Sequence, residues 1–77
     1  ITQMVSHCFN EYETTMKVEK VTHIRQNEGY ELDVYIRSPN PVPGHMIVEY
    51  EEYIADSLEK YGGILINKVI LHVNVWS

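Results

Sequence analysis

Metal-binding side chains are the clearest candidates for chemistry in this 77-residue sequence, which contains four histidines. His72 lies in a segment of alternating polarity, and Asn74 follows two residues later, so both side chains should point to the same face of a strand. His45 follows Gly44 at the start of a helical pattern, where the helix dipole disfavours a charged imidazole and favours the neutral form that binds metals. A solvent-facing histidine is the alternative interpretation of His45.

Acidic residues gather on the second helical pattern. Glu52, Asp56 and Glu59 recur at i, i+4 and i+7, a spacing at which like charges repel one another unless a cation neutralises them. A solvated acidic helix face explains the same pattern without any ligand. The spacing therefore permits a cation site on this helix but does not require one.

The remaining reactive side chains form no catalytic arrangement. Cys8 belongs to the apolar stripe of the first helical pattern, so the adjacent His7 is offset by about 100° and the two cannot share a metal ion. His23 and Arg25 suit either a solvated edge or a charge-paired clamp. The sequence has no nucleophile elbow, phosphate-binding glycine loop, HExxH motif or Ser/His/Asp arrangement, so we expect no enzymatic activity.

Two kinds of periodicity indicate the elements that carry these residues. Helices are predicted for residues 1–13 and from Ile47 to Gly62-Gly63, where glycine caps the helix. Strands are predicted for residues 16–26, 30–37 and 69–75, and a turn at residues 27–29 joins the first two as a hairpin. Three prolines predict an exposed, irregular loop at residues 38–44. The second helix is expected to bury Ile47, Tyr50, Ile54, Leu58 and Tyr61.

The order helix, strand, strand, helix, strand predicts an α+β fold with a three-stranded mixed sheet and both helices on one face. The chain is short enough that residues 1–77 should form a single domain. The face of the sheet without helices should be open to solvent. It would carry Asp33, Tyr35, His72 and Asn74.

Composition narrows the possible partners. Six basic and eleven acidic residues give a net charge of -5, and no basic run could neutralise a row of phosphates, so nucleic acid is not an expected partner. A divalent cation or a basic protein surface fits this charge better. A domain this small, without disulfides, often gains stability by self-association. We therefore expect a homodimer that uses the open sheet face or the edge of the last strand.

The cysteine count, the apolar runs and the first residue indicate the compartment of this chain and its relation to a longer protein. The single cysteine, Cys8, suits a reducing compartment, and no apolar run approaches the ~20 residues that a membrane span needs. The sequence opens on Ile1 rather than on methionine, so we expect a domain excised from a longer protein.

Four segments in this order resemble the C-terminal cytoplasmic domain of cation diffusion facilitator transporters: Ile24-Arg25-Gln26-Asn27-Glu28-Gly29, Leu32-Asp33-Val34-Tyr35-Ile36, Tyr53-Ile54-Ala55-Asp56 and Val69-Ile70-Leu71-His72. The resemblance covers nearly the whole chain and implies an αββαβ fold of the ferredoxin-like, metallochaperone-like type. It also implies a dimerising, regulatory, cytoplasmic domain of a membrane-embedded cation efflux transporter. Such a domain would bind zinc or a similar ion near the dimer interface.

The ligand positions of that family match this sequence only in part. The last-strand histidine is His72, whereas the second-strand position holds Tyr35 and the helix position holds Glu52. A carboxylate binds zinc, but the hydroxyl of Tyr35 and the amide of Asn74 are poor zinc ligands. If a divalent ion binds in this degenerate site, we expect His72, Glu52 and His45 to be its ligands.

Two other hypotheses compete with the transporter domain. The chain would be an α+β protein-interaction module with no metal role if it used its open sheet face for protein contacts alone. It would be a small enzyme of ferredoxin-like shape if Arg25 and Asn27 bound an anionic substrate.

Overall fold

The helices and strands follow the predicted order along the chain. The computed structural model describes residues 1–75. Within them the elements are α1 (Thr2–Tyr12), β1 (Lys17–Gln26), β2 (Gly29–Ser38), α2 (Gly44–Gly62) and β3 (Ile66–Val75). The predicted αββαβ order and the α+β class are therefore confirmed.

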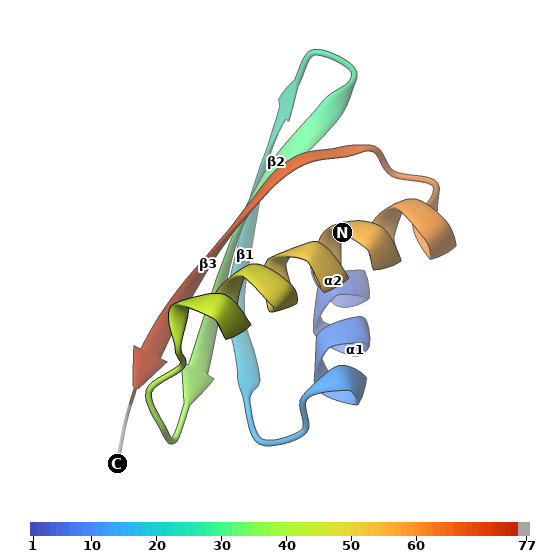
Figure 1. Ribbon diagram of the computed structural model, residues 1–77. Helices are drawn as coiled ribbons and strands as arrows, with labels where there is room; N and C mark the ends of the chain where they lie inside the picture. Colours follow the sequence, from blue (N-terminus) through green and yellow to red (C-terminus); the bar gives the residue numbers. More distant parts are fainter. Residues whose placement is uncertain (76–77) are drawn as a thin grey trace.

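The sheet has three strands in the order β1-β2-β3. β1 and β2 form an antiparallel hairpin, whereas β3 lies parallel to β2 after the crossover through α2. Both helices lie on one side of the sheet, and the tip of the β1–β2 hairpin projects beyond them (Figure 1). The other face of the sheet has no element packed on it among residues 1–75.

The hydrophobic core lies between the helices and the face of the sheet that they cover. Leu32, Val34 and Ile36 are almost fully buried, because every second residue of β2 points toward the helices. Each such side chain stabilises the fold by roughly 1.5–3 kcal/mol through its removal from water. The other buried apolar residues are Val5, Phe9, Met16, Tyr50, Ile54, Leu58, Ile66, Val69 and Leu71.

Two residues with positive φ angles end elements of the fold. Asn27 has a φ of 56° in the two-residue turn of the hairpin, so the predicted turn is confirmed, although Gly29 itself is the first residue of β2. Gly63 has a φ of 64° and ends α2, as predicted. Its N–H donates to Glu59 O at 3.2 Å, which is the bond of the αL capping motif. The N–H of Ile64 donates to Leu58 O at 3.2 Å.

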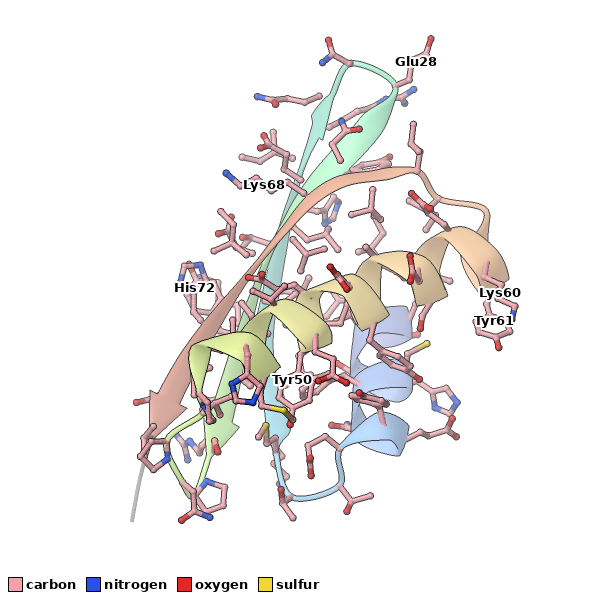
Figure 2. The ribbon with its side chains drawn as sticks, viewed as in Figure 1. Glu28, Tyr50, Lys60, Tyr61, Lys68 and His72 are labelled. Atoms are coloured by element: carbon pink, nitrogen blue, oxygen red, sulfur yellow. The ribbon has the colours of Figure 1, made fainter. Side chains whose placement is uncertain are left out.

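Two predictions of burial were wrong. Tyr61 is 72% exposed, because the last turn of α2 lies away from the strands and directs this side chain to solvent (Figures 1 and 2). Ser38 was assigned to the exposed loop, but it is the last residue of β2 and is 1% exposed. Its hydroxyl donates to Asn40 O at 2.6 Å and accepts from Asn40 N–H at 3.3 Å. The three prolines that follow are exposed, as predicted.

Gly29 lies where two segments approach too closely for a side chain. A Cβ atom there would lie 2.8 Å from the backbone oxygen of Leu65 and 2.8 Å from Asn67 Oδ1. That same Leu65 oxygen accepts a hydrogen bond of 3.0 Å from Tyr30 N–H. Asn67 Nδ2 donates to Gln26 O at 3.0 Å. Glycine at position 29 therefore allows the segment before β3 to lie against the hairpin.

We expect Gly29→Ala to lower the free energy of unfolding by about 1–3 kcal/mol, because the new methyl group would push against a backbone atom that cannot rotate away. Urea unfolding followed by circular dichroism measures this change. Gly44→Ala is the matched control. A Cβ atom at Gly44 meets nothing within 4 Å, so the control should be neutral or slightly stabilising. Equal unfolding midpoints for both variants would contradict the role of Gly29.

Candidate functional site on the open sheet face

The open face is the set of side chains that point away from the helices. Cross-strand neighbours in a sheet share a face, and successive residues alternate between faces. Since Leu32, Val34 and Ile36 are buried, the strand register defines the opposite set. It consists of Lys17, Lys20, Thr22 and Ile24 from β1, Glu31, Asp33, Tyr35 and Arg37 from β2, and Lys68, Ile70, His72 and Asn74 from β3.

An ordered cluster occupies the centre of the open face. The parallel register places Tyr35 opposite His72, and their rings stack with centroids 4.4 Å apart and planes 11° apart. His72 Nε2 lies 2.9 Å from Asp33 Oδ1. An ionised carboxylate can only accept, so Nε2 is the donor. On the other side, Lys20 Nζ lies 5.7 Å from the centroid of the Tyr35 ring. Contacts therefore connect side chains of all three strands.

A β-bulge in β1 sets the position of Lys20. The register shifts between Val18 and Lys20, so Glu19 is an extra residue. Val18 and Val21 consequently both pack on the core although their spacing is odd. Glu19 is turned toward the neighbouring strand, where its Oε2 lies 2.8 Å from Arg37 Nη2.

The central cluster is ordered but still accessible. The side chains of His72 and Asp33 are 42% and 33% exposed, and the exposed fraction of Tyr35 is 37%. Figure 2 shows His72 and Lys68 projecting from the same side of β3, away from α2. A partner could therefore contact these groups without unfolding any element.

The three predicted metal ligands do not lie on one surface. His72 is on the open face, whereas His45 and Glu52 are exposed residues of α2, which covers the other face. Glu52 lines a shallow hollow of about 290 Å³ between α2 and β3. Residues 1–75 contain no group of three or more His, Cys, Asp or Glu side chains placed to hold a metal ion. Metal binding therefore stays a prediction, and one protomer does not bring these ligands together.

Two α2 carboxylates contact the backbone around β3 instead. Glu51 Oε2 accepts a hydrogen bond of 2.8 Å from Leu71 N–H, and Glu59 Oε1 accepts one of 3.3 Å from Ile66 N–H. Glu59, which was predicted to belong to an acidic helix face, therefore binds a backbone N–H group instead. The i, i+4, i+7 spacing of the acidic residues did not indicate this contact, because the contact depends on where the edge of β3 lies.

The remaining predicted positions have local contacts. His23 lies on the projecting hairpin, with its ring 5.7 Å from that of Tyr30 in an edge-on arrangement. His7 Nε2 lies 3.3 Å from Glu11 Oε1 on α1. Sequence analysis placed Asp33 on the open face but missed it as the partner of His72. That pairing depends on the register between β2 and β3, and a helical crossover leaves the register open.

No protein-family model, no curated protein and no solved structure matches this chain. The resemblance to the cytoplasmic domain of cation diffusion facilitators therefore stays a prediction from short motifs. Neither helix in the described part of the chain has the length and apolar content that crossing a membrane requires.

A double-mutant cycle tests the central cluster. We expect Asp33→Ala and His72→Ala to show a coupling energy of about 0.5–1 kcal/mol, which is typical of a half-exposed cross-strand pair. The pair His7 and Glu11 is the control, because those side chains are 75% and 70% exposed and should couple more weakly. Urea unfolding of the single and double variants gives both values. Additive effects at Asp33 and His72 would contradict the contact.

Proposed function

We propose that this chain is a protein-interaction domain that forms a homodimer through its open sheet face. The observation that carries the proposal is the ordered cluster of Asp33, Tyr35, His72 and Lys20 at the centre of that face. Side chains already held in one arrangement lose little conformational entropy when a partner binds. The cluster therefore favours association at this face.

Apolar area on the open face supports the same proposal. Tyr35 and Ile70 are each 37% exposed, and Ile24 is 61% exposed. These side chains lie among charged residues, a mixture that suits a protein interface with an apolar centre and a polar rim. The edge of β3 is the less suitable surface, because Glu51 and Glu59 already bind backbone N–H groups of this strand.

Charge along the open face favours an antiparallel arrangement of two copies. Glu31 and Asp33 lie toward the hairpin end of β2 with Lys68 beside Glu31, so that end is net negative. Arg37 and its cross-strand neighbour Lys17 lie toward the other end with Glu19 beside Arg37, so that end is net positive. An antiparallel arrangement lays the Glu31 end of one copy over the Lys17 end of the other. A parallel arrangement would place like charges over one another, which costs free energy and suppresses that geometry.

We expect a dimer at tens of micromolar in sedimentation equilibrium. Ile70→Glu should produce a monomer, because it places a charge in the centre of the proposed interface. Val48→Glu is the matched control, since Val48 is an apolar residue of α2 that is 53% exposed on the helix side. A monomeric wild type, or a dimer that loses stability equally in both variants, would contradict the proposal.

A charge swap tests the antiparallel arrangement. Glu31→Lys and Lys17→Glu should each weaken the dimer by about tenfold, which corresponds to about 1.4 kcal/mol. The double variant should regain most of the wild-type affinity, because the opposite charges face each other again. Further weakening in the double variant would exclude this arrangement of the two copies.

A regulatory, cytoplasmic domain of a divalent-cation efflux transporter is the second candidate function, and one observation favours it. His72 Nε2 and Asp33 Oδ1 lie 2.9 Å apart on the open face, and imidazole with carboxylate is a common zinc ligand set. In an antiparallel dimer, the pairs of both copies lie near the centre of the interface. Two such pairs supply the number of ligands that zinc requires, which one protomer does not.

Melting temperatures with zinc and with a chelator test this second function. Zinc at about 100 times its dissociation constant should stabilise the dimer by roughly 2.7 kcal/mol. His72→Ala and Asp33→Ala should abolish that gain, and it should weaken at acidic pH because only neutral imidazole binds metal. The double variant His45→Ala with Glu52→Ala distinguishes the ligands predicted from sequence. An unchanged zinc effect in that variant assigns the ion to the open face, and no effect in the wild type leaves a metal-free interaction domain.

A further inference from the structure

A cleft lies between the two helices, on the opposite side of the molecule from the open face. Its volume is about 530 Å³, within the range of sites that hold small organic ligands. Met4, Cys8 and Tyr53 give it largely apolar walls, and Glu11 and Tyr61 are exposed residues of its lining. Gln3 and His7 complete the lining.

Tyr53 and Tyr61 line the cleft, and the ring of Tyr53 is held in place by a second tyrosine. Tyr53 stacks on Tyr12 with centroids 4.0 Å apart and planes 17° apart. Tyr12 in turn meets the buried Tyr50 edge-on at 5.7 Å. Tyr61 stands at the C-terminal end of α2 (Figure 2). Rings held in this way present π faces without a large entropy loss on binding.

Met4 is an apolar residue of the cleft lining and lies against the end of α2. A side chain at Gly62 would collide with the Met4 methyl group. Because this methyl group ends a flexible side chain that can move aside, the contact shows that α1 lies against the end of α2 but does not require glycine there. The cleft is thus a consequence of how the two helices pack.

The electrostatic environment of the cleft is negative. α1 and α2 together carry six acidic residues and a single basic residue, Lys60. Burial and then the nearby carboxylate of Glu49 raise the pKa of Tyr12. Burial and then Glu13 raise the pKa of Tyr50 in the same way. Tyr12 does not line the cleft but stacks on Tyr53, which does, and the excess of carboxylates on the two helices would favour a cation there.

Aromatic rings beside a carboxylate form a site for an organic cation. The ring of Tyr61 has Lys60 Nζ at 5.5 Å from its centroid, a cation–π distance, so a ligand cation at this ring would displace the Lys60 side chain. Glu11 lies on the lining, and although His7 Nε2 is 3.3 Å from its Oε1, a carboxylate offers several acceptor positions. A hydrated metal ion fits less well, because it needs several oxygen ligands and the walls are mostly apolar.

We propose that this cleft binds a small organic cation with a trialkylammonium head group, which would lie against Tyr53 and Tyr61 with its charge directed to Glu11. The alkyl groups would contact Met4 and the ring faces. This site is separate from the open face, so the inference does not depend on the proposed dimer or on metal binding.

Choline is the probe, and 3,3-dimethyl-1-butanol is its neutral counterpart of the same shape. Titration of the ¹⁵N-labelled chain with choline should give saturable shifts of amide signals in α1 and α2. The neutral alcohol should bind at least about tenfold more weakly, because the cation–π and carboxylate attractions depend on charge. Equal affinity for the two probes, or no saturable shifts with choline, would overturn the proposal.

Variants of exposed residues localise the binding without risk to the core. Tyr61→Leu and Glu11→Gln should each weaken choline binding several-fold, because one removes a π face and the other removes the charge. Glu28→Gln, in the hairpin turn, removes a carboxylate far from the cleft; it is the control and should leave choline affinity unchanged. Loss of affinity in the control together with no loss in the two cleft variants would place the site elsewhere and overturn the assignment.

Discussion

The rest of the structure depends on the burial of β2 on one side only. Leu32, Val34 and Ile36 pack against helices that cover a single face of the sheet. Because strand residues alternate, burial of these three forces the four residues between and beside them to point outward. A register slip of one residue would expose the apolar set and bury charges, so this packing fixes the whole strand. β2 thus defines the core and the open face together.

The parallel pairing of β2 and β3 determines which side chains are neighbours on the open face. The register puts His72 beside Tyr35 and within 2.9 Å of Asp33. Register shifts in β1 and at the start of β3 determine which side chains lie around this cluster. The bulge at Glu19 brings Lys20 over Tyr35. A second register shift, where β3 begins, leaves Asn67 to bind Gln26 O on the hairpin.

The two sides of the molecule have different chemistry because the helices hold most of the acidic residues. The open face mixes both signs of charge, with basic residues on β1 and with acidic and basic residues at opposite ends of β2. The helix layer combines a negative potential with a cluster of tyrosine rings around the cleft. The net charge of -5 therefore comes mainly from the helix layer and not from the sheet. This difference underlies our two proposals, a protein partner for the open face and a small cation for the cleft between the helices.

The sequence by itself determined the element order, the hairpin turn at Asn27, the glycine end of α2 and the outward side of β2. These features depend on local backbone preferences and on periodicity, which neighbouring residues encode. The sequence did not determine that Tyr61 is exposed, that Glu51 and Glu59 bind the backbone around β3, or that Asp33 pairs with His72. Only the tertiary structure decided these, because each depends on how far α2 extends along the sheet and on the register with which β3 joins β2. Residues 33 and 72 are brought together by a helical crossover, and a crossover has no local pattern that sets its register.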